Sequence, residues 1–145
     1  MTDEKLTKNM EDYLEAIYIL QKKNGSATIT GLSAFLSVRK PSVNSALHFL
    51  AERGFVNYQR YQKVTLTENG HEYARNVYNR HVTLKNFLIE ILNVEESQAE
   101  ENACRMEHVI DEDIFTKFSE FLEFVLKSNI SCVDIKKFKI ECKEG

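Results

Sequence analysis

The order of the periodic segments between residues 9 and 66 constrains the fold more than any other feature of the chain. Apolar residues at helical spacing predict a first helix that ends before Gly25. A short helix with Thr30 as its N-cap follows. Pro41 then begins a third helix, because the first turn of a helix does not need the N–H that proline lacks. Gly54 ends this third helix. Two β-rich segments complete the series. The expected elements cover residues 9–23, 31–36, 41–53, 55–58 and 63–66. This order predicts a winged helix-turn-helix with a two-stranded wing.

The rest of the chain is expected to be helical, so the fold class is mainly α. Thr67 is the expected N-cap of a long helix over 68–92, and Ser97 is the expected N-cap of a helix that carries residues 104–108. A last helix over 113–127 has more apolar surface than a small unit can bury, which a partner subunit would cover. Packing within one chain is the alternative. We expect a DNA-binding domain over 1–72 and a helical metal-binding and dimerisation domain over 73–145.

The two expected domains also differ in net charge. Residues 1–71 carry nine Lys or Arg against seven Asp or Glu, net +2, while residues 72–145 carry ten against fifteen, net −5. A basic first half suits phosphates and an acidic second half suits cations. No apolar run approaches the ~20 residues of a membrane span, and the polar start lacks a signal sequence, so a cytoplasmic location is expected. Three cysteines are an odd number for a disulfide framework.

Cys104, Glu107 and His108 are spaced i, i+3 and i+4, which on a helix places all three on one face. Thiolate, carboxylate and imidazole are the donors that divalent transition metals take. The triplet predicts a metal site. The alternative is a solvated helix with one buried cysteine.

The basic residues between 39 and 63 and the polar start of the Pro41 helix are the parts that could meet a duplex. Arginine and lysine would contact phosphates, and short polar side chains would reach base edges. The alternative is a solvated patch on a small α+β fold. The candidates are Arg39, Lys40, Pro41, Ser42, Asn44, Ser45, Arg60 and Lys63.

Several motifs in order resemble the diphtheria-toxin-repressor and manganese-repressor family. They are Glu11–Tyr18, Pro41–Val43, Leu66–Gly70, Arg80–His81 and Ala103–Val109. The resemblance implies a homodimeric repressor that binds double-stranded operator DNA, and the short, two-domain form without the SH3-like third domain. It also implies a Mn(II) or Fe(II) site between the two domains. Because the ligands would come from both sides of the domain junction, we expect a bound cation to fix the recognition helices for DNA. Carried over by position, the ligands are Asp12, Glu15, His81, Cys104, Glu107 and His108.

The ligand set mixes two branches of that family. Asp12 and Glu15 match the manganese branch, whereas Cys104 matches the iron branch. Carboxylates favour Mn(II) and a thiolate favours softer ions, so Mn(II) is preferred to Fe(II), with Zn(II) or Co(II) binding in vitro. Glu100 and Lys85 fall where the iron branch has an ancillary site, and a lysine there removes a cation ligand.

The expected function is metal-dependent repression of metal-homeostasis genes, without catalysis and without a small organic substrate. A metal-independent winged-helix regulator is one alternative. A helical metalloenzyme or metal store is another, but the chain lacks the Glu-x-x-His repeats and the His-Glu-x-x-His motif of such proteins.

Overall fold

The computed structural model of the chain describes residues 5–59 and 63–128. These residues form two compact units, and the boundary between Met1–Tyr78 and Asn79–Gly145 falls inside helix α4. In the described part of the chain, no helix is both long enough and apolar enough to cross a membrane.

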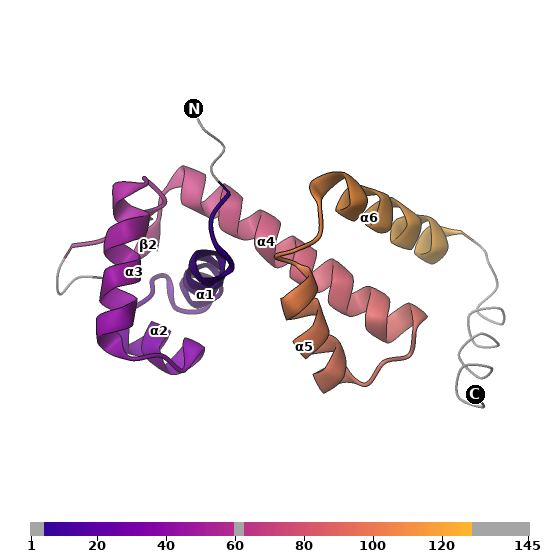
Figure 1. The fold of residues 1–145 in the computed structure, drawn as a ribbon, viewed down its shortest axis with the longest axis horizontal. Coiled ribbons are helices and arrows are strands. Elements are labelled where there is room, and N and C mark those ends of the chain that lie inside the picture. The colour runs from indigo at the N-terminus through magenta and orange to yellow at the C-terminus, as the bar shows by residue number, and fades with distance from the viewer. Residues whose placement is uncertain (1–4, 60–62, 129–145) are drawn as a thin grey trace. The chain divides into compact units, whose positions relative to one another are not determined.

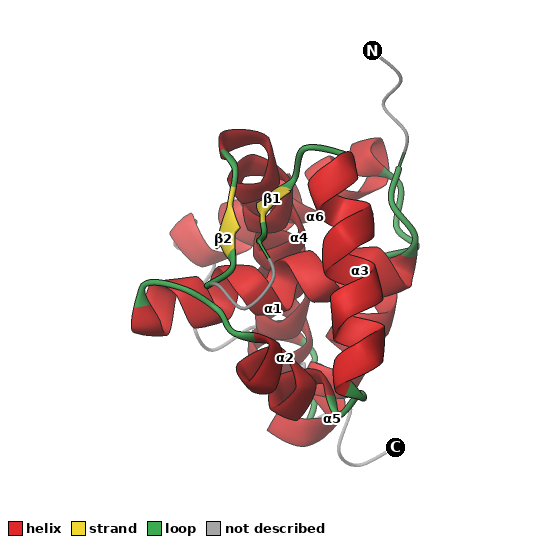
Figure 2. Cartoon of the chain, turned by 90° about the vertical axis from the view of Figure 1, so that its left-hand side faces the viewer, coloured by secondary structure: helices red, strands yellow, loops and turns green. Residues whose placement is uncertain are grey.

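The first unit is built around helix α1, which contacts α2, α3 and β2 (Figure 1). Strands β1 and β2 pair antiparallel with Val56 opposite Leu66, and Figure 2 shows them side by side. Leu14, Ile17 and Leu47 have no exposed surface and form part of the core. The elements are α1 (Lys8–Asn24), α2 (Ile29–Leu36), α3 (Lys40–Glu52), β1 (Val56–Asn57), β2 (Thr65–Leu66) and the start of α4 (Glu68–Asn86). The predicted fold class, a winged-helix unit followed by a helical unit, is confirmed.

The helix ends of the first unit agree with the sequence in most places. Gly25 follows α1 in the left-handed region, with φ at 83°, as its place after the apolar run predicts. The Thr30 cap is wrong, because Thr28 has the extended backbone of an N-cap and its Oγ1 accepts from the Gly31 N–H at 3.0 Å. Pro41 is the second residue of α3, which begins at Lys40.

Thr67 is the expected start of α4, and its hydroxyl has two partners. Its Oγ1 accepts from the Gly70 N–H at 3.0 Å and donates to the Gly54 carbonyl oxygen at 2.6 Å. The hydroxyl therefore caps the helix and also fastens it to the turn that ends α3. An isolated bridge between Ala27 and Val64 extends the small sheet.

The second unit holds the rest of α4, the π-helical turn η1 (Phe87–Ile91), α5 (Glu96–Met106) and α6 (Glu112–Lys127). The helix expected to run evenly to Leu92 thus changes from α to π geometry after Asn86. Phe87 packs edge-on against Phe118 of α6, with ring centroids 4.9 Å apart. This contact fastens the π-helical turn to the last helix.

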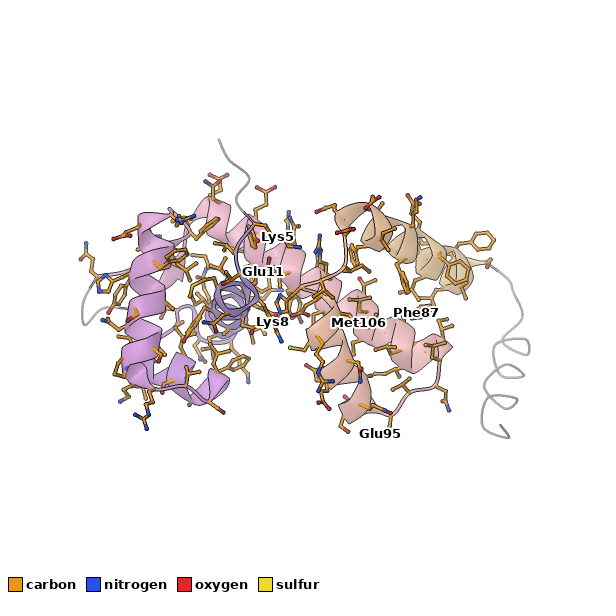
Figure 3. The ribbon with its side chains drawn as sticks, viewed as in Figure 1. Lys5, Lys8, Glu11, Phe87, Glu95 and Met106 are labelled. Atoms are coloured by element: carbon orange, nitrogen blue, oxygen red, sulfur yellow. The ribbon has the colours of Figure 1, made fainter. Side chains whose placement is uncertain are left out.

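Glu95, not Ser97, is the N-cap of α5 (Figure 3). Its carboxylate accepts from the N–H groups of Ser97 at 3.1 Å and of Gln98 at 3.3 Å. The carboxylate also carries a charge opposite to that of the helix N-terminus, which adds to the stability of this cap.

Candidate metal centre

Glu107 lies in the turn that follows α5. The helix ends at Met106, so the sequence expectation of helix through His108 is wrong in its boundary. Glu107 nevertheless keeps helical angles, φ −58° and ψ −29°, and its N–H bonds to the Ala103 carbonyl at 3.0 Å. One donor atom each of Cys104, Glu107 and His108 lie within 4.8 Å of one another. The three side chains therefore lie together as the sequence spacing predicts, although the helix ends at Met106.

Each carboxylate oxygen of Glu107 faces a different imidazole. Oε2 lies 2.7 Å from His81 Nδ1, and Oε1 lies 3.1 Å from His108 Nε2. Glu107 is 1% exposed, and both histidines are buried. A buried carboxylate is costly unless its charge is compensated, so this arrangement requires protons or a cation among these groups.

The second nitrogen of His81 is held from the other side. Glu100 Oε1 lies 2.8 Å from His81 Nε2, and Glu100 Oε2 lies 2.8 Å from Lys85 Nζ. A carboxylate on the far nitrogen of a metal-binding histidine fixes its tautomer and ring orientation. The geometry therefore assigns Nδ1 of His81 to the centre and Nε2 to Glu100.

Lys85 shapes the charge around Glu100. The hydrogen bond with Glu100 is the main cause that raises the pKa of Lys85, and Glu96 adds to it at 3.6 Å. Partial burial by itself would raise the pKa of Glu100, but Lys85 and His81 together outweigh it and lower that pKa. An ammonium group thus stands among carboxylates beside the centre.

Arg80 is a positioning residue that sequence reasoning did not single out. Its guanidinium donates to the carbonyl oxygens of Glu107 and Ile110, at 3.3 Å each, and pairs with Glu112 at 3.0 Å. These bonds hold the turn between α5 and α6 from the preceding helix. The only sequence signal was its place beside His81 in one of the motifs quoted above.

Four of the six proposed ligands thus come from the second unit. The other two, Asp12 and Glu15, lie one helical turn apart on α1 of the first unit, and both are half-buried.

The donors of the second unit fit a divalent transition metal. Ligand atoms about 2.0–2.3 Å from one ion lie at most about 4.6 Å apart. The donor atoms of Cys104, Glu107 and His108 all lie within 4.8 Å of one another, which is compatible with one ion. A set that contains a thiolate and an imidazole suits neither Ca²⁺ nor Mg²⁺, which take oxygen ligands.

The residues expected to contact DNA lie mainly at the start of α3. Arg39, Lys40 and Ser45 are exposed, as are Pro41 and Ser42. Lys63, at the other end of the wing, is exposed too. Asn44 is half-buried and accepts a hydrogen bond from the Tyr58 hydroxyl. Arg60 lies outside the described residues.

A winged-helix unit followed by a helical unit in which a half-buried cysteine lies beside a buried carboxylate and imidazole defines a class of metal-responsive DNA-binding regulators. Two family models match the chain. One, described as the N-terminal DNA-binding domain of iron-dependent repressors, matches residues 5–64. The other, their metal-binding and dimerisation domain, matches residues 67–129.

Curated relatives agree with the family models. An uncharacterized HTH-type transcriptional regulator of Methanocaldococcus jannaschii is 36% identical over 81% of this chain and 95% of its own length. The HTH-type transcriptional regulator MntR of Bacillus subtilis is 25% identical over 92% of this chain and 93% of its own. The chain belongs to the iron-dependent repressor family, which comprises transcriptional regulators and not enzymes.

Solved structures give the same fold. A manganese-dependent transcriptional repressor in complex with manganese is 25% identical, with a TM-score of 0.73 over 79% of this chain and 53% of that chain. The IdeR of T. acidophilum is 26% identical, with a TM-score of 0.69 over 78% of this chain and 53% of that chain. The chain therefore spans about half the length of these structures.

Proposed function

We propose that the chain is a homodimeric repressor that binds operator DNA when Mn(II) or Fe(II) occupies the centre around Glu107, and so controls metal-homeostasis genes. The observation that carries this proposal is the convergence of His81, His108 and Cys104 on one buried carboxylate, in the domain that the family uses for metal binding and dimerisation. A divalent cation bound there would supply the positive charge that the carboxylate needs.

The residues of the centre are poised to exchange a proton for a cation. The 2.7 Å contact between His81 Nδ1 and Glu107 Oε2 requires a proton on one of the two atoms. When that proton leaves, both atoms become electron-pair donors, while Glu100 still holds the ring by Nε2. Metal loading should therefore release protons and strengthen as the pH rises.

Asp12 and Glu15 complete the proposed ligand set. The resemblance to the manganese branch supports this assignment, as does their i, i+3 spacing on α1, which directs both carboxylates to one side of the helix. Since they belong to the DNA-binding domain, their participation would couple metal loading to the placement of α3. Asp12→Asn and Glu15→Gln should each weaken Mn(II) binding without unfolding either domain.

Mn(II) is the preferred ion. Three carboxylates supply hard donors, and both the MntR relatives and the manganese-bound structure are similar to this chain. Cys104 draws the preference toward Fe(II), and toward Zn(II) or Co(II) in vitro. Cys104→Glu should therefore favour Mn(II) further in competition titrations against Zn(II).

The direct experiment measures DNA affinity by fluorescence anisotropy against duplexes selected from random sequence, with chelator and with each metal. Mn(II) or Fe(II) should raise the affinity at least tenfold for the native chain and leave it unchanged for Glu107→Gln. Glu101→Gln is the matched control, because Glu101 lies exposed on α5 and pairs with Arg105. Equal DNA affinity with chelator and with metal would instead identify a metal-independent winged-helix regulator.

A further inference from the structure

Tyr58 joins the wing to the proposed recognition helix. It directly follows β1, and its hydroxyl donates a hydrogen bond to Oδ1 of Asn44 on α3. Its ring also packs edge-on against His48, with centroids 5.2 Å apart. Asn44 and His48 are four residues apart, so they form one stripe of α3 that faces Tyr58. Asn44 and Tyr58 are half-buried, which limits how far either side chain can move.

In the structure, the Asn44 amide is turned so that its oxygen faces Tyr58. The Tyr58 hydroxyl engages Oδ1, so the two N–H bonds of Nδ2 point away from the tyrosine. An asparagine that reads adenine uses both amide atoms, with Oδ1 accepting from N6 and Nδ2 donating to N7. An amide whose oxygen is already held presents mainly its donors, which suit acceptors such as guanine O6 and N7 or thymine O4.

We propose that Tyr58 is a specificity-determining residue that acts through Asn44, by holding its amide as a hydrogen-bond donor toward the DNA. This inference rests on the proposed binding of operator DNA through α3. It assigns the residue after β1 a role in base selection, in addition to any phosphate contacts of the wing.

The test selects bound duplexes from random sequence in the presence of Mn(II) and compares the base preferences of five proteins. They are the native chain, Tyr58→Phe, Asn44→Ala, Asn44→Asp and the double variant Tyr58→Phe with Asn44→Ala. Tyr58→Phe frees the amide to turn, so it should change the preference at one position of each half-site, by about two- to tenfold, the value of one hydrogen bond. Asn44→Asp keeps the acceptor for Tyr58 but removes the donor, and should abolish the preference at that same position.

The double variant separates positioning from folding. If Tyr58 acts through Asn44, the double variant has the base preference of Asn44→Ala alone. Tyr78→Phe is the matched control, because its ring packs against Tyr18 in the same unit and it should select the native sequence. The side-chain amide signals of Asn44 in the NMR spectrum of the free protein should also shift in Tyr58→Phe and stay in place in Tyr78→Phe.

Identical base preferences for Tyr58→Phe and the native chain would overturn the inference and leave the proposed function standing. A double variant that differs from Asn44→Ala would also overturn it, since Tyr58 would then act by another route. A native chain that enriches no sequence with any metal would overturn both the inference and the proposed function.

Discussion

At the scale of single residues, the centre depends on how one buried carboxylate shares its two oxygens. Glu107 contacts His81 with Oε2 and His108 with Oε1, and Arg80 holds its backbone carbonyl. The side chain is thus oriented by its neighbours and its main chain is fixed by another helix. Such support lets a donor set bind an ion without first rearranging, which is how surrounding residues usually contribute to metal affinity.

Lys85 offers a prediction at this scale. Its ammonium lies 2.8 Å from Glu100 and 3.6 Å from Glu96, so it occupies a position beside two carboxylates of α5 where a cation would be attracted. Lys85→Glu replaces that charge with a further carboxylate next to Glu100 and His81 Nε2. Isothermal titration with Mn(II) should show one more ion bound per subunit than the native chain binds.

Lys85→Leu is the control for that titration. It removes the ammonium and adds no metal ligand, so it should leave the number of bound ions unchanged. If Lys85→Glu also left the number of bound ions unchanged, Glu100 and His81 would not bind an additional ion.

The sequence predicted the site residues unequally. Cys104, Glu107 and His108 stand four residues apart or less, and helical spacing alone groups them. His81 is far from them in the chain and was assigned only through the resemblance. The role of Arg80 could not be predicted, because it bonds backbone carbonyls 27 and 30 residues away, and such bonds leave no trace in residue type.

At the scale of the elements, short-range chemistry explains both the predicted boundaries and the errors. Gly25 and Thr67 were predicted correctly because each is the best candidate within its turn. Thr28 and Thr30, or Glu95 and Ser97, are rival caps only two residues apart. The residue with extended backbone angles becomes the cap, and the path of the chain into the helix determines which of the two residues that is.

Glu95 gives a prediction that depends on pH. Its hydrogen bonds with the Ser97 hydroxyl and with the Ser97 and Gln98 N–H groups lower its pKa from 4.5. A carboxyl whose pKa is lower in the folded state adds stability above its unfolded pKa, and loses it as the pH falls through the folded value. Glu95→Ala should therefore lower the thermal midpoint at pH 7, and the difference from the native chain should narrow below about pH 4.

Ser97→Ala is the companion measurement for the cap. It removes the predicted cap residue but keeps the carboxylate and both N–H donors, so it should destabilise less than Glu95→Ala at pH 7. A larger loss for Ser97→Ala would restore serine as the cap.

Gly70 gives a second prediction about an element, in the first turn of α4. A Cβ placed there would lie 1.8 Å from the carbonyl oxygen of Phe55, far inside contact distance. The same carbonyl accepts from the Thr67 N–H at 3.0 Å, so moving it away would break this hydrogen bond. Gly70→Ala should cost about 1–3 kcal/mol of unfolding free energy in urea titrations, in the range of other overpacked sites.

The neighbouring residue supplies the control for Gly70. Asn69→Ala adds no atoms and changes an exposed side chain in the same turn, so it should stay near native stability. Equal stability of the two variants would show that Phe55 and α4 can move apart without lowering the free energy of unfolding.

At the scale of the whole molecule, helix α6 leaves an apolar face exposed. Leu122 and Val125 are buried in the second unit, whereas Ile114, Phe121 and Phe124 are 46%, 55% and 63% exposed. Intervals of seven and three residues place these three on one side of the helix. The sequence predicted excess apolar surface here from composition, but only the structure separates the buried side of the helix from the open one.

That face argues for the homodimer, since the second unit matches a dimerisation domain and a contiguous exposed apolar surface often marks a contact with a partner. Phe121→Asp should give a folded monomer in light-scattering chromatography, because the substituted side chain is exposed and the core of the unit is untouched. Its DNA affinity should fall by about 100-fold or more, because each subunit would then bind its half-site without the gain from a linked neighbour. Thr116→Asp places the same charge on an exposed position around the helix and should remain dimeric. If Phe121→Asp stays dimeric and binds DNA like the native chain, the subunits meet elsewhere.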